Sequence, residues 1–131
     1  MDQTNKFSFA PELFIKNGVS DIDFYKKAFG AMELRRFTND DGSIHVAELV
    51  IGEAMFHLHE VTANPLSFEP GKHNGTTTTI GLFVPDVDSV MKAAIAAGAK
   101  EISPAKDYEY GYRQGQIMDP FGHQWMIQMK I

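Results

Sequence analysis

Cysteine is absent from the 131 residues, which excludes disulfide bonds, a thiol nucleophile and a thiolate metal site. The same absence favours the cytoplasm, where disulfides are rare. The chain has no basic cluster, and its net charge of −5 argues against a nucleic-acid partner, because phosphate binding requires clustered Lys and Arg. No apolar run approaches the roughly 18 residues of a membrane-spanning helix. The polar N-terminus, Met1–Lys6, also lacks the apolar core of a signal peptide.

The first half of the sequence contains the pattern of one helix followed by several strands. Ser20 is placed to cap a helix that ends at Gly30, since glycine commonly follows the last turn of a helix. In the strand before this helix, Glu12 falls on the face opposite Leu13. The predicted strands of this half cover residues 7–15, 32–38, 43–51 and 55–60. A β-α-β-β-β unit is therefore predicted over about residues 7–61.

The same pattern returns after a linker. Residues 62–77 are rich in Pro and Gly with little periodicity, so they predict a connecting loop long enough to serve as a lid. A strand over residues 78–84 and a helix capped by Asp86 follow, and the helix ends at Gly98. The segment 28–31, Ala-Phe-Gly-Ala, is matched by Ala-Ala-Gly-Ala at 96–99. The chain is predicted to be a single α+β domain, residues 1–131, made of two tandem βαβββ units (about 7–61 and 78–131).

The stretch Asp119–Gln128 reads Asp-Pro-Phe-Gly-His-Gln-Trp-Met-Ile-Gln, a tight turn followed by a strand. Trp125 and Ile127 alternate with Met126 and Gln128, which predicts one buried face and one facing water or a cavity. This turn and strand resemble the last hairpin of the glyoxalase/bleomycin-resistance/extradiol-dioxygenase (vicinal oxygen chelate) superfamily. The longer motif Asp-Pro-Phe-Gly-His-Gln-Trp-Met is most similar to the PhnB-like branch of this superfamily, and the resemblance extends over nearly the whole chain.

That resemblance implies a curved eight-stranded mixed sheet around a cavity, commonly in a homodimer. Enzymes of the superfamily hold a divalent metal in this cavity through His, Glu or Gln. Matched by spacing from the local motifs, the family's ligand positions fall here on Ala10, Thr79 and Met126. Alanine and methionine do not bind a hard divalent ion, and a lone threonine binds one poorly. We therefore predict no metal cofactor at these positions.

A second cluster of residues offers an alternative site for a divalent metal ion. His57 and His59 are two residues apart on one predicted strand, so both side chains project to the same face. Glu12 is assigned to the inward face of the first strand, and two imidazoles with one carboxylate make a plausible divalent site. The competing interpretation is that these are polar residues lining the cavity.

Aromatic residues and one arginine precede the seventh predicted strand. Tyr110 and Arg113 suit the stacking of a planar ligand and the binding of an anionic group. Gly111-Tyr112-Arg113 also matches the Gly-x-Arg of PhnB-like sequences. The alternative is a surface loop in which Arg113 pairs with an acidic neighbour. We assign His123 to shaping the turn before the last strand.

These observations support two hypotheses of different classes. The first is a metal-free protein that binds a small aromatic or anionic molecule in the cavity. The second is a glyoxalase-type lyase or isomerase that uses a divalent metal or a Glu12/His57/His59 site. A structural partner protein is a third reading, but no coiled, basic or low-complexity segment supports it. The candidate ligand-binding residues are Glu12, His57, His59, Tyr110, Arg113, Met126 and Gln128.

Overall fold

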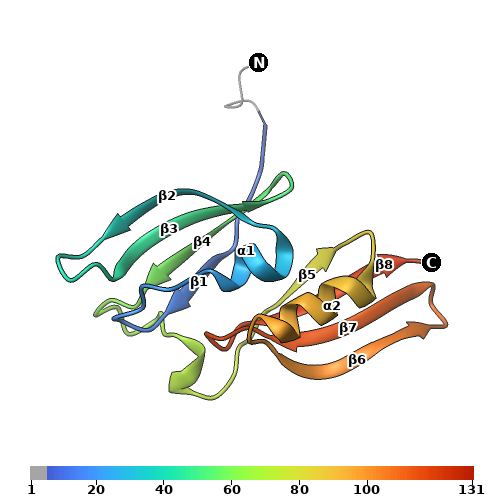
Figure 1. The fold of residues 1–131 in the computed structure, drawn as a ribbon. Coiled ribbons are helices and arrows are strands. Elements are labelled where there is room, and N and C mark those ends of the chain that lie inside the picture. The colour runs from blue at the N-terminus through green and yellow to red at the C-terminus, as the bar shows by residue number, and fades with distance from the viewer. Residues whose placement is uncertain (1–5) are drawn as a thin grey trace.

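The computed structural model describes residues 6–131 and shows two βαβββ units, each a four-stranded sheet with one helix (Figure 1). Sheet A has the strand order β1-β4-β3-β2, and sheet B has the order β5-β8-β7-β6. In each sheet the first strand runs parallel to the last, and the other pairs are antiparallel. The elements are β1 (Glu12–Ile15), α1 (Phe24–Phe29), β2 (Met32–Thr38), β3 (Ile44–Ile51), β4 (Ala54–Glu60), η2 (Pro70–Lys72), β5 (Thr79–Phe83), α2 (Val87–Ala96), β6 (Lys100–Tyr108), β7 (Tyr112–Met118) and β8 (Gln124–Lys130).

The predicted α+β class and the repeated unit are confirmed, but the eight strands do not form one continuous sheet. Among the described residues β1 pairs only with β4, and β5 pairs only with β8, so both strands end their sheets with an edge that no other described strand pairs with. The two helices pack against each other, and their apolar residues join the sheets into one core. No helix within residues 6–131 is long and apolar enough to cross a membrane.

Two local predictions in the first unit are wrong. The first strand begins at Glu12 rather than at residue 7, and the segment before it leaves the body of the protein with Phe7 and Phe9 almost fully exposed (Figure 1). Pro11 marks this boundary because its ring lacks the N–H that a strand needs. The first helix begins at Phe24, not after Ser20, since Asp21 accepts a bond from the Asp23 N–H and forms a separate turn.

The predicted end of the first helix at Gly30 and the predicted start of the second at Asp86 are confirmed, whereas α2 ends at Ala96, two residues before Gly98. Gly30 adopts a φ of 67° directly after α1, in the left-handed region that glycine enters at little cost. The side chain of Asp86 accepts a hydrogen bond from the Ser89 N–H at the start of α2, as an N-cap residue does. α2 packs on β6, β7 and β8 of sheet B, and Tyr25 of α1 contacts Phe56 on β4 of sheet A with ring centroids 5.2 Å apart.

A buried polar cluster connects the two units. Asp119 lies in the β7–β8 turn and accepts bonds from the Tyr25 hydroxyl of α1 at 2.6 Å and the Trp125 indole N–H at 3.0 Å. Its other carboxylate oxygen accepts the backbone N–H groups of Phe121 and His123. Asp119 and Tyr25 are both buried. The Asp-Pro-Phe-Gly-His turn is thus held against the helix of the other unit through one carboxylate.

Tyr25 gives this cluster a predicted dependence on pH. Burial first, and then the charge and hydrogen bond of Asp119, raise the pKa of Tyr25 well above its ordinary value of 10.0. The folded protein therefore keeps this proton at a pH where the unfolded chain releases it, so stability is lost as the pH rises above about 10. Chemical denaturation of wild type and Tyr25→Phe between pH 8 and 11 should show a steeper alkaline loss in wild type. Parallel curves would contradict this prediction.

Candidate functional site

Sheet A has one face covered by α1 and an opposite, open face. Strand register places Glu12, His57, Glu48 and Arg35 in one row across this open face, and Arg35 lies 3.9 Å from Glu48. The next row contains Phe14, His59, Val46 and Phe37. The predicted grouping of Glu12 with His57 and His59 is therefore present on one face, next to a second carboxylate and a guanidinium.

The open face of sheet B, on the side away from α2, is made of amides and aromatic rings. Glutamine side chains form two cross-strand hydrogen bonds of 2.7 Å each, Gln114 to Gln128 and Gln116 to Gln124. Gly81 on β5 leaves space there, because a Cβ at this position would come within 2.7 Å of the Gln128 amide. The predicted residues Met126 and Gln128 lie on this face.

A row of aromatic rings continues this face at one end of sheet B. Tyr108 stacks on Tyr110 with centroids 5.3 Å apart, Tyr110 approaches Tyr112 at 5.8 Å, and Tyr112 approaches Phe83 at 5.9 Å. The ammonium group of Lys106 lies 4.8 Å above the Tyr108 ring. The predicted residue Tyr110 is thus one member of a four-ring surface, and its hydroxyl donates to Gln114.

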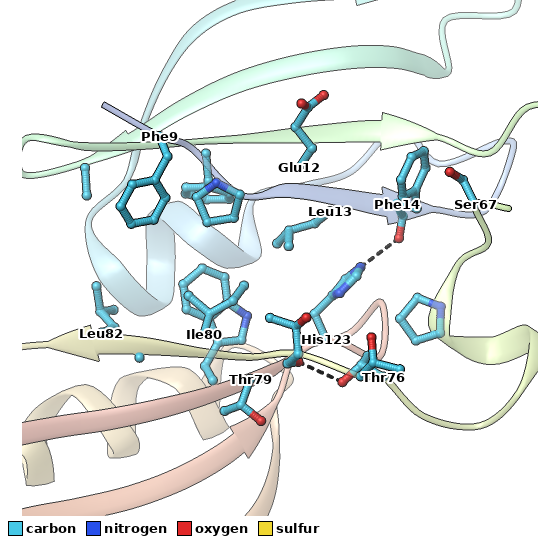
Figure 2. A pocket seen from close by; sticks show the side chains of 18 of the residues that line it. Phe9, Glu12, Leu13, Phe14, Ser67, Thr76, Thr79, Ile80, Leu82 and His123 are labelled. Carbon is cyan, nitrogen blue, oxygen red and sulfur yellow. Dashed lines mark hydrogen bonds between the residues drawn. The ribbon is translucent and has the colours of Figure 1, made fainter. Parts of the chain in front are cut away.

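Between the unpaired edges of β1 and β5 lies a trough of about 1350 Å³ (Figure 2). Apolar side chains such as Leu13 and Ile80 form much of its wall, and the linker contributes Phe68 and the hydroxyls of residues 76–78. The linker therefore lines this trough, and its predicted role as a lid stays a prediction. Figure 2 also shows Glu12 and Thr79 pointing in opposite directions from the two sides of the trough.

His123 has a contact that the sequence did not reveal. Its Nε2 atom lies 2.7 Å from the carbonyl oxygen of Phe14 on the free edge of β1 (Figure 2). A carbonyl only accepts, so Nε2 carries the proton. His123 therefore does more than shape its turn, because it also links the last hairpin to the first strand.

The candidate residues do not converge within one chain. Glu12, His57 and His59 share the open face of sheet A, whereas Tyr110, Met126 and Gln128 belong to sheet B. The family's ligand positions Thr79 and Met126 lie on the open face of sheet B, and Ala10 precedes β1. Within residues 6–131, no three His, Asp or Glu side chains are arranged so that they could hold a metal ion.

Arg113 lies on the opposite side of sheet B from Tyr110, Met126 and Gln128. Its guanidinium donates to Asp88 of α2 at 2.7 Å and to Asp107 of β6 at 2.9 Å, and these contacts raise its already high pKa. Gly115, two residues further along β7, faces Met91 of the same helix. The prediction that Arg113 reaches into the cavity beside Tyr110 does not match this placement, and the alternative of pairing with an acidic neighbour does.

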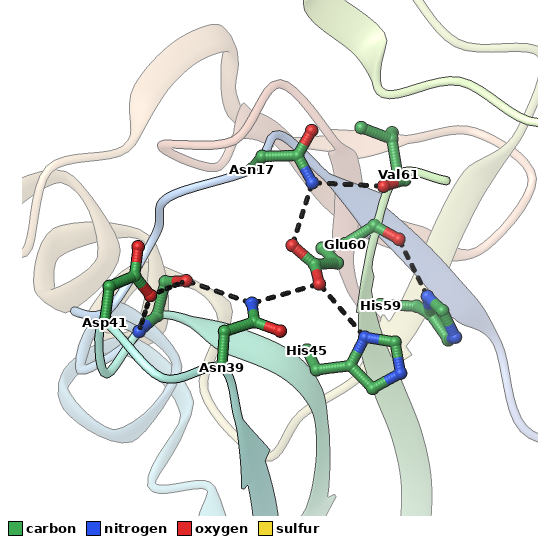
Figure 3. Close-up of polar contacts among 8 residues, drawn as sticks. Asn17, Asn39, Asp41, His45, His59, Glu60 and Val61 are labelled. Atoms are coloured by element: carbon green, nitrogen blue, oxygen red, sulfur yellow. Dashed lines mark hydrogen bonds and ion pairs between the residues drawn. The ribbon is translucent and has the colours of Figure 1, made fainter. Parts of the chain in front are cut away.

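Glu60 is the centre of a polar cluster at the end of β4 (Figure 3). Its carboxylate accepts bonds from Asn17 at 2.8 Å, Asn39 at 3.0 Å and His45 Nδ1 at 3.0 Å. These bonds, that of Asn17 first, lower the pKa of Glu60 and keep it ionised at neutral pH. The backbone carbonyl of the same residue accepts from His59 Nδ1 at 2.8 Å. Glu60 thus fixes two imidazoles at once.

The comparisons with known proteins agree with the fold. Residues 12–127 match the family model of the Glyoxalase/Bleomycin resistance protein/Dioxygenase superfamily, and the chain belongs to this superfamily. An uncharacterised protein of Mycobacterium bovis is 38% identical over 121 residues, covering 90% of this chain and 80% of that protein.

Two solved structures are similar over nearly the full length. The Arabidopsis thaliana At5g48480 gene product has a TM-score of 0.70 and 25% identity, covering 93% of this chain and 98% of that one. TioX from Micromonospora sp. ML1 has a TM-score of 0.67 and 26% identity, covering 95% of this chain and 97% of that one.

Proposed function

We propose that this protein binds a small planar aromatic molecule without the usual metal of the superfamily, and that it belongs to the PhnB-like branch. The observation that carries the proposal is the open face of sheet B, where a row of four aromatic rings borders two hydrogen-bonded glutamine pairs. Aromatic rings gain about 0.5–1.5 kcal/mol from a stacked or edge contact beyond their buried area. Amides supply donors and acceptors that orient such a ligand.

Lys106, rather than the predicted Arg113, is the residue that we propose binds an anionic substituent of the ligand. Arg113 is engaged on the α2 side by Asp88 and Asp107. Lys106 instead lies over the ring of Tyr108 on the open face, where it offers a positive charge beside a stacking surface. A planar aromatic ring that carries a carboxylate or phenolate group therefore fits this surface best.

We further propose that the protein acts as a homodimer in which the open face of sheet A covers the open face of sheet B of a second copy. A twofold axis makes this contact twice, so one dimer has two equivalent cavities. The charges of the two faces support the pairing. Sheet A presents two carboxylates, Glu12 and Glu48, against one guanidinium, Arg35, whereas sheet B presents three lysines by register. Opposite net charges favour A-to-B contact over A-to-A or B-to-B. These lysines are Lys100, Lys106 and Lys130.

Binding can be tested with a panel of planar aromatic compounds, neutral and carboxylated, screened by ligand-detected NMR and ranked by calorimetry. We expect Tyr110→Leu to weaken the best compound roughly three- to tenfold, as loss of one ring contact does. Lys106→Met should weaken only carboxylated compounds. The matched control is Arg113→Met, which changes the other face of the same hairpin and should leave affinity unchanged. If no compound binds, or if Arg113→Met weakens binding as much as Tyr110→Leu, the proposal is wrong.

A glyoxalase-type lyase or isomerase remains the second candidate, and one observation favours it. Glu12 and His57 are direct neighbours across β1 and β4 on an open face, with Glu48 next in the row. A carboxylate beside an imidazole suits transfer of a proton next to a carbonyl group. Activity on an α-keto or thiohemiacetal substrate that is lost in Glu12→Gln would support the enzyme and count against a purely binding role.

A further inference from the structure

His45 and His59 are held side by side by the same residue, Glu60 (Figure 3). The ring centroids are 5.2 Å apart at an interplanar angle of 64°. His59 also approaches the Phe14 ring at 5.8 Å, which restricts its rotation from the other side. Two imidazoles this close, each fixed through one nitrogen, form a pair whose remaining nitrogens are available to a ligand.

The hydrogen-bond partners determine which nitrogen of each ring is free. The ionised carboxylate of Glu60 only accepts, so His45 donates from Nδ1, and the backbone carbonyl of Glu60 imposes the same tautomer on His59. In this tautomer the nitrogen that carries the lone pair is Nε2 in both rings. In Figure 3 both rings present this nitrogen on the side away from the Glu60 carboxylate.

We propose that His45 and His59 bind a borderline divalent metal ion, with Zn²⁺ as the best fit, through their two Nε2 atoms. The spacing supports this, since two imidazoles on one tetrahedral Zn²⁺, with Zn–N bonds of about 2.0–2.1 Å, have ring centroids about 5 Å apart. Metal-binding histidines almost always donate the other ring nitrogen to a carboxylate or backbone carbonyl. Glu60 provides one of each.

The surroundings of Glu60 keep this arrangement in place before any ion arrives. Its side chain is only 12% exposed, whereas that of His45 is 47% exposed. Asn17 comes from the segment after β1 and Asn39 from the β2–β3 turn, where Asn39 also donates to Ser43. Two separate segments thus hold the carboxylate rigid while the imidazole remains accessible.

This site differs from the family's metal positions, which fall here on Ala10, Thr79 and Met126, and it needs neither Glu12 nor His57. Two protein ligands leave two tetrahedral positions for water or for oxygen atoms of a bound molecule. Such a site holds its ion weakly when no other donor is present. We therefore expect it to fill when Zn²⁺ is supplied rather than to retain an ion through purification.

Calorimetric titration of the full chain with ZnCl₂ tests the proposal. We expect one ion per chain, and loss of this binding in His45→Gln and in His59→Gln. Glu60→Gln should weaken Zn²⁺ binding by about 10- to 100-fold, the usual effect of removing the partner of a metal-binding histidine. MgCl₂ should give no binding, because Mg²⁺ prefers oxygen ligands.

The matched control is His57→Gln, which removes an imidazole from the same strand and should leave the affinity for Zn²⁺ unchanged. Because Glu60 also connects two turns, thermal melting of Glu60→Gln should accompany the titration. If that variant unfolds, the two histidine variants decide the matter. No saturable Zn²⁺ binding by the wild-type protein, or equal losses in His57→Gln and His45→Gln, would overturn the proposal.

Discussion

Asp119→Ala is expected to lower the free energy of unfolding by about 3–5 kcal/mol, because it leaves several buried donors without an acceptor. The Tyr25 hydroxyl and the Trp125 indole N–H both point at this carboxylate from inside the core. The turn N–H groups of Phe121 and His123 lose their acceptor at the same time. Since a domain has only about 5–15 kcal/mol of stability in total, this one change removes a large part of it.

The measurement is urea denaturation followed by Trp125 fluorescence, together with a thermal melt in which the midpoint should fall by roughly 10–20 °C. Asp119→Asn should lie between the alanine variant and wild type, since its amide oxygen still accepts while its NH₂ group faces the indole donor. Asp107→Ala is the control, because that carboxylate is exposed and pairs only at the surface. A loss below about 1 kcal/mol in Asp119→Ala would show that the cluster does not hold the units together.

The turn that contains Asp119 was predictable from the sequence, but the contact of Asp119 with Tyr25 was not. Asp119-Pro120 and Gly122 predict a turn from local chemistry alone, and the turn is present with a bond from Gly122 N–H to the Asp119 carbonyl. The contact with Tyr25 joins residues 94 positions apart, so no local pattern contains it. Similarly, the alternation in β8 predicted its two faces, but the gap between β1 and β5 depends on how the two units pack.

Arg113 is a case in which the sequence held a usable signal. Positions 113, 115 and 117 alternate on one face of β7, and Ile117 is fully buried beneath α2. Because Arg113 is an even number of residues from Ile117, it lies on the same face of β7, the face covered by α2, and Tyr112 lies on the other. The Gly-x-Arg resemblance alone suggested the opposite side.

The pairing of His45 with Glu60 could also have been read from the turn between β3 and β4. Ile51 pairs with Ala54 across a two-residue turn, and the same register opposes Val46 to His59. Residues 45 and 60 then fall next to each other at the far end of the hairpin. The strand register does not predict that Asn17 and Asn39, which come from two other segments, hold the Glu60 carboxylate in place.

A mixture of two inactive variants should recover ligand binding if the cavity is shared between two copies. His57→Trp fills the open face of sheet A, and Gly81→Leu fills the open face of sheet B above Gln128. Each variant alone should lose binding of the best aromatic compound, because both cavities of its dimer contain the bulky residue. In a mixed dimer one cavity carries both substitutions and the other carries neither.

Unfolding and refolding the two variants together should therefore restore about a quarter of the binding sites, as twofold symmetry with random pairing requires. Size-exclusion chromatography of each variant checks that the dimer itself persists, and Arg113→Met mixed with wild type serves as a control with full binding. Recovery of no sites from intact mixed dimers would mean that each cavity belongs to one chain. A site of that kind would lie either on the open face of sheet B alone or in the trough between β1 and β5.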